Sequence, residues 1–500
     1  MTSRPGRRRP AGGAPAEATA ISRMSANDLM TLATDVGTPP VQIAGIMRLD
    51  GGSALRPEDV VAAVAERVRG LPRFRQRLVR APLGAGRPYW TDDPGFDVRR
   101  HLHVERCPEP GDDDALLAVA NRAVTRRLPR DRPLWSATFV TGLAGEDAAL
   151  VFVFHHVLTD GLGGLAVFIR MVDGAPVPAT PGFPRPAPTR RRLYADATAT
   201  RLRALTRWRS GLRNVRRAAL ELRTGRAAAP RSSLNRPIGP RRVFAVARTG
   251  VAAVRPAARA HGATLNDVVL TATTGALRAL LRRRGETVDE LVVSMPVSAR
   301  GRDAGAALGN HVGAVPLPLP TAGATRDRLA RIAALTRRRR GAVRGASATL
   351  LAPVFRILAR LHLLEWFVAH QHLISTSITY LPGPPRRRSF LGTPVTEVVP
   401  LSTIKGNMTV SFVALSYAGR LTITAVADPG QFPDLPVLMA ALRAELAGLG
   451  AAAPDGARPK SPAAGHNDTS GDPVTTPTVG RDSTETDSAP IAEGNREYRS

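Results

Sequence analysis

Apolar and polar residues alternate along this chain in segments that predict β-strands joined by helices. The most distinctive segment, residues 150–154, consists of five apolar residues that run directly into His155 and His156. A short apolar run bounded by turn residues predicts a buried strand. An Asp-Gly pair follows, and residues 162–172 predict a helix. The pattern therefore places an imidazole at the end of a buried strand, at the mouth of a cleft.

The same apolar periodicity predicts further elements along the rest of the chain. Strands are expected at residues 41–49, 138–141, 241–247, 291–297, 311–317, 375–380, 408–416 and 421–427. Helices are expected at residues 57–69, 116–127, 326–340, 353–369 and 435–449. One more helix is predicted after Thr264, which with Asp267 forms a variant of the capping box. Strands that alternate with helices favour an α/β sandwich.

The two histidines and the Asp-Gly pair are the strongest candidate for chemistry. Neutral imidazole is suited to removing a proton from an alcohol near pH 7. Successive residues of a strand point to opposite sides, so His155 and His156 should face different environments, with His155 toward the core. Asp160 can cap backbone N–H groups or pair with an arginine, and Gly161 allows a positive φ or a close approach by another segment. The alternative is a buried histidine pair with a purely structural role.

The segment His155-His156-x-x-x-Asp160-Gly161 resembles the signature of the CoA-dependent acyltransferase superfamily, which includes chloramphenicol acetyltransferases and peptide-synthetase condensation domains. Within it, the chain resembles the bacterial wax ester synthase/diacylglycerol acyltransferase family over roughly residues 24–450. The further motifs in that family's order are Pro133-Leu134-Trp135, Leu234-Asn235-Arg236-Pro237-Ile238-Gly239, Asn266-Asp267, Pro296-Val297-Ser298, Arg300, Gly309-Asn310 and Pro382-Gly383-Pro384.

This resemblance implies a fold, a reaction and a set of roles. The fold is α/β, with two chloramphenicol-acetyltransferase-like sandwich domains and the active site in a channel between them. The reaction is the transfer of a long-chain acyl group from acyl-CoA to diacylglycerol or a fatty alcohol. His156 is then the general base, His155 orients the site, and Asp160 is structural and pairs with an arginine. Arg75 is the first candidate for that partner and Arg77 the second.

Two further residues are candidates for contacts with the substrate. Asn266 lies in the first turn of a predicted helix, where its amide could hold the thioester oxygen as it becomes negative. Its alternative role is helix capping. Arg300 could bind a phosphate of CoA or form an ion pair with a carboxylate such as Asp160. No permanently bound cofactor and no metal are expected, because acyl-CoA is the substrate and Cys107 is the single cysteine.

Length and composition suggest how the chain is divided. Five hundred residues exceed what one core usually supports, so two domains are expected. The proposed segments are a disordered basic tail at residues 1–23, an N-terminal acyltransferase domain at 24–175, a linker with a basic crossover helix at 176–236, a C-terminal acyltransferase-like domain at 237–452 and a disordered tail at 453–500.

The net charge of +29 points to anionic partners. Residues 205–222 predict a helix with one apolar stripe surrounded by arginines. It is either a crossover helix with a solvated basic face, a membrane-surface helix or a nucleic-acid arm. Aromatic residues make up only 4% of the chain, which argues against specific nucleic-acid binding. No apolar run of membrane-spanning length and no secretory signal is present, so we expect a cytoplasmic protein.

We therefore expect peripheral association with the inner face of the plasma membrane or with a lipid-droplet surface. The acceptor remains open, because residues 379–381 are Thr-Tyr-Leu where the family commonly has Thr-Asn-Val. The alternatives are an acyltransferase of secondary metabolism with another acceptor or a carrier-bound donor, and a degenerate lipid-binding homologue. The oligomeric state is also left open by the sequence.

Overall fold

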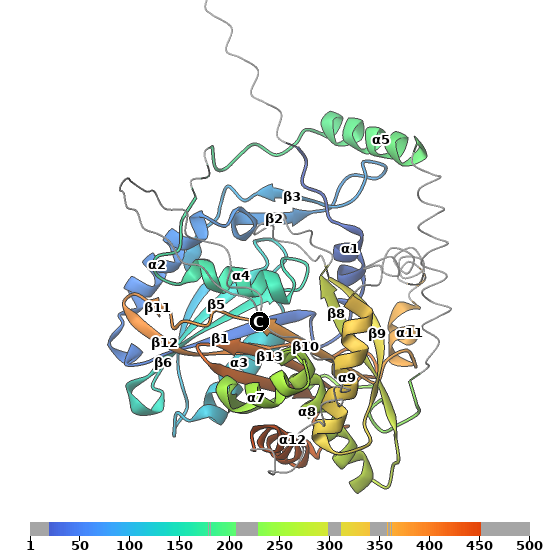
Figure 1. Ribbon diagram of the computed structural model, residues 1–500. Helices are drawn as coiled ribbons and strands as arrows, with labels where there is room; N and C mark the ends of the chain where they lie inside the picture. Colours follow the sequence, from blue (N-terminus) through green and yellow to red (C-terminus); the bar gives the residue numbers. More distant parts are fainter. Residues whose placement is uncertain are drawn as a thin grey trace, which may run out of the picture. The chain divides into compact units, whose positions relative to one another are not determined.

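The computed structural model describes residues 20–178, 180, 182–206, 229–298, 312–340, 358, 361 and 363–451. Two six-stranded sheets form the framework (Figure 1). The first, called here the N-terminal sheet, has the order β11 (Ser389–Phe390), β12 (Thr393–Leu401), β1 (Gln42–Leu49), β6 (Ala148–His155), β5 (Trp135–Thr141) and β4 (Leu102–Arg106). The second, the C-terminal sheet, has the order β7 (Val243–Gly250), β14 (Arg420–Ala427), β13 (Val410–Tyr417), β10 (Thr376–Pro382), β8 (Glu290–Ser298) and β9 (Val312–Pro320).

Helices cover these sheets, and a short β-ladder stands apart from them. The helices are α1 (Ala26–Ala33), α2 (Pro57–Arg69), α3 (Asp113–Thr125), α4 (Gly161–Met171), α5 (Arg190–Thr206), α7 (Val251–Ala260), α8 (Leu265–Arg283), α9 (Thr325–Arg340), α11 (Leu364–Ala369) and α12 (Leu435–Gly450). Short 3₁₀ helices lie at Gly52–Ala54, Pro72–Arg75, Val98–Arg100 and Ala144–Glu146. The separate ladder joins β2 (Gln76–Val79) to β3 (Tyr89–Asp92).

The N-terminal sheet is buried on both faces, which explains why β6 is apolar at every position before its histidine. One face packs with α2 and α4 in a core that includes Phe152 and Leu165, and Figure 1 shows α4 lying over this sheet. The other face packs with α3 in a second core that includes Val151 and Val153. All eight residues of β6 are buried. Burial on both faces favours a continuous apolar run over an alternating one.

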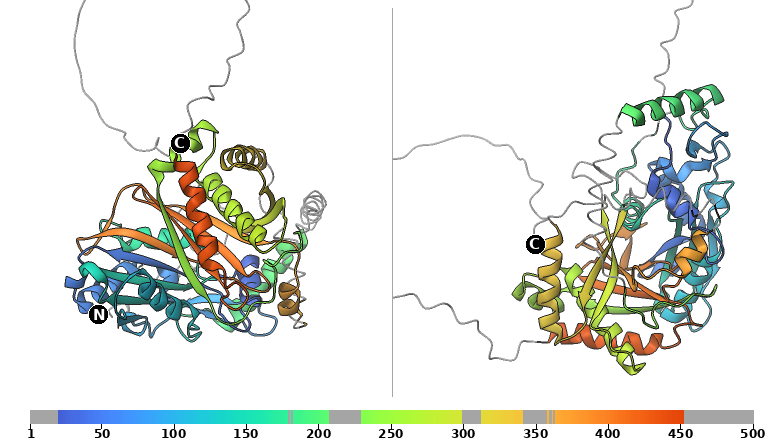
Figure 2. Two further views of the ribbon diagram at one scale, coloured as in Figure 1. Left: turned by 90° about the horizontal axis from the view of Figure 1, so that it is seen from below. Right: turned by 90° about the vertical axis from the view of Figure 1, so that its right-hand side faces the viewer.

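The C-terminal sheet packs against α7, α8 and α12, which gather on one side of it (Figure 2). Helix α8 is capped by Thr264, whose backbone N–H donates to the Asp267 carboxylate at 2.8 Å, so the predicted capping box is confirmed. Because α8 lies between the sheet and α12, it is buried around most of its surface, including Thr271, Thr273 and Thr274. An amphipathic stripe suffices only for a helix with one solvated face.

Strand β12 is the main element that the sequence pattern does not predict. It returns from the C-terminal half of the chain and pairs antiparallel with β1, with Gly45 opposite Pro400. The sequence of this strand contains Pro394, Glu397 and Pro400. It is not predicted because prolines and charges argue against an interior strand. The N-terminal sheet is therefore completed by residues that lie more than 340 positions after β1.

The α/β architecture and most of the predicted strands and helices are confirmed. Ser22 and Arg23, at the end of the predicted tail, lie against β3, where Trp90 N–H donates to Ser22 O at 2.8 Å. The predicted domain boundaries stay a prediction. The rest of that tail, the C-terminal tail, most of the basic helix at residues 205–222 and the first part of the helix at residues 353–369 lie outside the described residues.

Candidate active site

His155 is the last residue of β6 and His156 follows it, so both lie next to the start of β1. In the ladder between these strands, His155 lies opposite Gln42. His155 N–H donates to Leu134 O and His156 N–H donates to Val41 O, both at 3.0 Å. The backbone of both histidines is therefore fixed by neighbouring segments before their side chains make any contact.

The His155 side chain is fixed on the core side. Its ring is buried, and Nε2 lies 3.1 Å from the Asp35 carboxylate. Its Nδ1 accepts a hydrogen bond from Val157 N–H at 3.2 Å. Because Nδ1 is the acceptor, the ring proton lies on Nε2 and is donated to Asp35. These two contacts define the neutral Nε2–H tautomer and leave His155 no free nitrogen for substrate.

Asp35 is the centre of a buried polar network. Its Oδ2 also accepts from Arg127 at 2.8 Å and Arg130 at 2.6 Å, while Oδ1 accepts from Val41 N–H at 3.0 Å. Burial acts to raise the pKa of Asp35, but the hydrogen bonds from His155, Val41 and Arg130 outweigh it and hold the pKa well below its usual range. Asp35 is therefore an ionised anchor for His155.

His156 has a different environment on the opposite side of the strand. It is half-buried and lines a pocket, and its buried Nδ1 has no hydrogen-bond partner on another described residue. Burial lowers the pKa of His156, and this effect outweighs its own backbone and the charges of Asp160 and Asp28, which act to raise it. His156 is thus neutral at pH 7, the form that accepts a proton.

Asp160 and Gly161 form the start of α4 beside His156. Asp160 is the N-cap of this helix, and its Oδ1 accepts from Gly163 N–H at 2.8 Å. Gly161 has no positive φ, in contrast to one of the reasons suggested for it. The other reason holds, because a Cβ on Gly161 would lie 3.1 Å from the Leu381 side chain of β10. The glycine lets α4 approach the C-terminal sheet closely.

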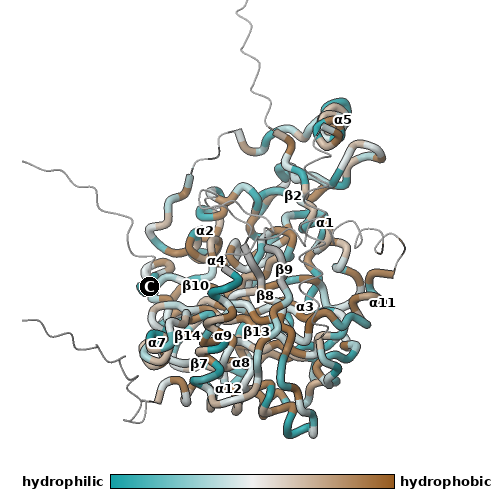
Figure 3. The backbone as a smooth tube through the Cα atoms, turned by 45° about the vertical axis from the view of Figure 1, so that its right-hand side comes forward, coloured by the Kyte–Doolittle hydropathy of each residue, from teal (hydrophilic) through white to brown (hydrophobic). Residues whose placement is uncertain are grey.

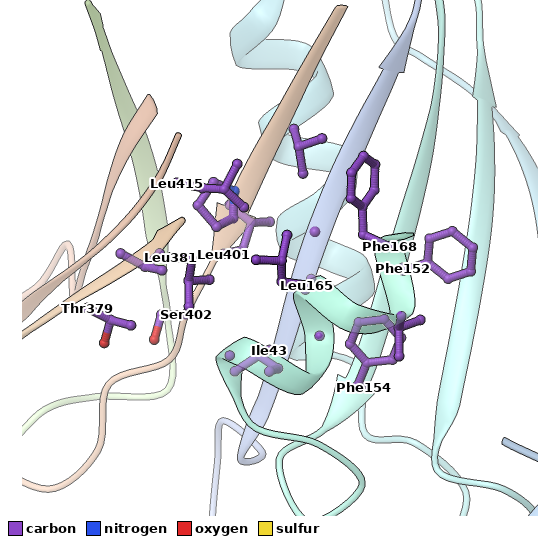
Figure 4. Close-up of a pocket in the computed structure, with 18 of the residues that line it drawn as sticks. Ile43, Phe152, Phe154, Leu165, Phe168, Thr379, Leu381, Leu401, Ser402 and Leu415 are labelled. Carbon is purple, nitrogen blue, oxygen red and sulfur yellow. The ribbon is translucent and has the colours of Figure 1, made fainter. Parts of the chain in front are cut away.

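The pocket has an empty volume of about 1160 Å³, part of it open to solvent. Figure 4 shows its walls, with Ile43 and Phe152 from the N-terminal sheet and Phe168 from α4 on one side, and Leu381 and Leu415 from the C-terminal sheet on the other. Most lining residues are apolar. The polar ones are His156, Asp160, Thr379, Tyr380 and Ser402.

The structure therefore brings His156, Asp160 and Gly161 together at one pocket, but not every predicted site residue. Asn266 is on α8, where its amide Nδ2 lies 3.9 Å from the sulfur of Met295, and it is not among the lining residues. Its proposed substrate contact stays a prediction. Arg300 lies outside the described residues.

The candidate arginine partners of Asp160 are engaged elsewhere or exposed. Arg75 donates to the carbonyl of Arg69 at 2.8 Å and lies over the ring of Phe183. Arg77 is exposed on β2. The arginine pair of Asp160 stays a prediction, and the contact that the structure defines for this carboxylate is the cap on α4.

Three residues of the site were not predicted. Asp35 lies in the segment between α1 and β1, and Ser402 follows β12, an element that the prolines conceal. Tyr380 is among the lining residues, and its hydroxyl lies 2.8 Å from the Ser416 hydroxyl. Burial raises the pKa of Tyr380, so it is a neutral hydrogen-bonding group. Its position in the unusual Thr-Tyr-Leu segment was the one available signal.

The chain matches known proteins in sequence as well as in fold. A family model described as the wax ester synthase/diacylglycerol acyltransferase catalytic domain matches residues 24–269, and the model of the C-terminal domain of the same family matches residues 308–450. A Mycobacterium tuberculosis protein named probable diacylglycerol O-acyltransferase is 31% identical over 399 residues, which cover 77% of this chain and 86% of that protein.

Solved structures show the same fold. A wax ester synthase/diacylglycerol acyltransferase from Marinobacter aquaeolei superposes with a TM-score of 0.61 at 22% identity, covering 86% of this chain and 98% of that one. The first condensation domain of the calcium-dependent antibiotic synthetase, solved with a substrate analogue, gives a TM-score of 0.59 at 21% identity, with 86% and 97% covered.

The two sheets and the histidine motif at the end of β6 define an acyltransferase fold of the chloramphenicol-acetyltransferase-like type. Two matching family models and a relative at 31% identity identify the family within this fold class. The chain belongs to the wax ester synthase/diacylglycerol acyltransferase family.

Proposed function

We propose that this protein transfers a long-chain acyl group from acyl-CoA to the hydroxyl of diacylglycerol or a fatty alcohol, with His156 as the general base. Family membership supports the reaction class. The observation that carries the proposal is the position of His156, a neutral imidazole at the wall of a large apolar pocket. His155 and Asp160 are positioning residues in this account, because their contacts are to other protein groups.

The pocket suits an acyl chain. Ligand pockets are usually lined mainly by apolar side chains with a few polar groups. Here the polar groups are few, and the carboxylate of Asp160, the one acidic lining residue, already accepts the cap hydrogen bond from Gly163. A hydrocarbon chain loses no hydrogen bonds on entering such a space and gains about 25 cal/mol for each Å² of apolar surface buried.

The reaction requires one proton to pass from the acceptor hydroxyl to His156 and then to the leaving group. His156 takes the proton from the acceptor hydroxyl as the oxygen forms its bond to the thioester carbon. The carbon–sulfur bond then breaks, and the proton passes from His156 to the departing sulfur. CoA leaves as the thiol, the ester remains, and the imidazole is neutral again. A positioned base of this kind contributes about 10²–10⁴-fold to the rate.

We also propose that the protein binds peripherally to anionic lipid surfaces. None of the helices in the described ranges is long and apolar enough to cross a membrane. Helix α11 and its flanks expose large apolar side chains, and Figure 3 shows α11 as an apolar segment. These side chains are Leu361, Leu363, Trp366 and Leu373. Exposed apolar side chains on a protein of net charge +29 suit an anionic bilayer.

A vesicle experiment tests this surface. The protein should co-sediment with phosphatidylglycerol vesicles at low salt and be released as salt rises. Trp366→Ser should weaken binding, because the Trp366 side chain is 63% exposed and available for insertion. Val104→Ser is the matched control, since Val104 is a similarly exposed apolar residue on β4. Equal loss in both variants would exclude a specific role for α11.

The transferase activity is tested by incubating the purified protein with labelled palmitoyl-CoA. The panel of acceptors is diacylglycerol, fatty alcohols of several lengths and a sterol. Labelled ester and free CoA should form in equal amounts with diacylglycerol or a fatty alcohol. Acyl transfer to none of these, with the chain still folded, would contradict the proposed function.

A further inference from the structure

A second pocket lies on the other side of the segment that follows β12. It has an empty volume of about 570 Å³, part of it open to solvent. In contrast to the apolar pocket, it contains two basic side chains, Arg242 and Lys405, together with the carboxylate of Glu365. Its remaining lining comes from the loop after α1, the Pro237–Ile238 segment, α11 and Gly406.

Arg242 is buried in this pocket, and no carboxylate of the described residues forms an ion pair with it. It is 5% exposed, and its guanidinium donates to the backbone carbonyls of Gly239 and Arg241. Its Nε is buried and has no hydrogen-bond partner among the described residues. Burial lowers the pKa of Arg242 to about 10, against the charge of Asp428, so it remains a cation at neutral pH. A buried cation that forms no ion pair within the described residues favours an anionic ligand.

Lys405 adds a second cation. Its Nζ donates to Val36 O at 3.1 Å, and no carboxylate within the described residues forms an ion pair with it. Burial lowers the pKa of Lys405 to about 8. The charged groups that face it are Asp35, Arg127, Arg242 and Glu365. Asp35 is already bound by His155, Arg127 and Arg130, and Glu365 is exposed, so the pocket retains an excess of positive charge.

This basic pocket is close to the reacting centre. Ser402 lines the apolar pocket with His156, and Lys405 lines the basic pocket only three residues later, at most about 11 Å along the chain. Thr34 and Val36 line the basic pocket on either side of Asp35, whose carboxylate contacts His155. The two pockets are thus lined by neighbouring residues of one segment, and the basic pocket lies beside the Asp35–His155 contact.

Building on the proposed function, we infer that the pocket of Arg242 and Lys405 binds the phosphate groups of the acyl-CoA donor. The donor has three chemically different parts in a row, namely an apolar chain, a thioester and a phosphate-bearing nucleotide end. The protein presents a counterpart to each part, namely the apolar pocket, His156 in its lining and the basic pocket. Glu365 opposes the bound phosphate, so its charge lowers the affinity for the donor.

The test is a calorimetric titration of the full-length protein with CoA and with pantetheine, which has the same thiol arm but no phosphate. Lys405→Met should weaken CoA binding about tenfold, as expected for the loss of one charge-assisted contact, and leave pantetheine binding unchanged. Glu365→Gln should strengthen CoA binding. The wild-type affinity for CoA should fall as the pH rises through about 8, and Lys405→Met should abolish that fall.

Arg420→Met is the matched control, because it removes one exposed positive charge at the opposite end of β14 from the pocket, roughly 23 Å away along the strand. Its CoA affinity should equal that of the wild type. Equal weakening by Arg420→Met and Lys405→Met would mean that only the net charge attracts CoA, and would overturn the inference.

A lipid headgroup is the other source of phosphate. If Lys405→Met reduces binding to phosphatidylglycerol vesicles while CoA binding stays the same, the pocket binds lipid phosphate and the assignment to CoA is wrong. The proposed function fails separately, because it requires ester formation by the wild-type protein, whereas the titration measures binding without turnover.

Discussion

The two sides of the end of β6 differ in almost every physical respect, although His155 and His156 are adjacent. On the core side, both ring nitrogens of His155 have partners, and Asp35 is surrounded by donors. On the pocket side, His156 is half-buried and its Nδ1 has no partner on another described residue. Strand alternation creates this division, because consecutive side chains point to opposite faces.

The difference shows how one strand end can combine rigidity with reactivity. The satisfied histidine holds the backbone in place through Asp35, so its neighbour is positioned through the strand rather than through a second side chain on its Nδ1. The neighbour therefore keeps its proton-accepting capacity for the substrate.

Asp35→Asn should disrupt the buried polar network that holds His155. It should give the largest loss of unfolding free energy among the substitutions considered next. A neutral amide cannot balance the charges of Arg127 and Arg130, and disrupting a buried ionic network costs roughly 3–5 kcal/mol. Because Arg127 and Arg130 reach solvent, we expect the lower end, about 3 kcal/mol, in urea unfolding. Asp59→Asn, which breaks an exposed pair with Arg56, should leave the unfolding free energy close to that of the wild type.

The acid dependence of the same variant sharpens this prediction. The pKa of Asp35 is lower in the folded protein than in the unfolded chain, so its stabilising contribution is complete above the ordinary carboxyl value of 3.8. That contribution is lost as the pH falls below this value toward the lowered folded pKa. The stabilities of the wild type and Asp35→Asn should therefore converge in strong acid, and a constant difference would refute the ionised anchor.

The pH dependence of turnover tests whether His156, on the pocket side of β6, is the neutral base. The base must be neutral, and the pKa of His156 is lowered below its ordinary value of 6.5 by burial. The kcat/KM for acyl-CoA should therefore stay constant from pH 8 down past 6.5 and fall about tenfold per pH unit only below the lowered pKa. A midpoint above 6.5 would contradict the lowered pKa of His156.

Substitutions of Asp160 should have the smallest effect on stability. They distinguish its role as a helix N-cap from a role as the partner of an arginine. As an N-cap, Asp160→Ala should cost about 1 kcal/mol in thermal or urea unfolding, whereas Asp160→Asn should be nearly neutral, because asparagine caps as well as aspartate. If the predicted arginine pair dominates instead, Asp160→Asn should destabilise as strongly as Asp35→Asn.

The sequence predicts the local parts of this site and not the distant ones. The apolar run of β6, the histidine pair and the start of α4 are contiguous, so their periodicity and turn residues suffice to predict them. Asp35 was missed because its contact with His155 spans 120 positions and depends on the register of β1 against β6. Similarly, Ser402 and Tyr380 reach the pocket only because β12 and β10 fold back beside the N-terminal half.

The most direct test measures turnover and unfolding free energy together for His155→Ala and His156→Ala. His156→Ala should lower ester formation from palmitoyl-CoA by about 10²–10⁴ and leave the unfolding free energy close to that of the wild type. His155→Ala should instead destabilise the fold by leaving the buried Asp35 carboxylate without its histidine donor. A stable and inactive His155→Ala beside an active His156→Ala would contradict the assignment of the base.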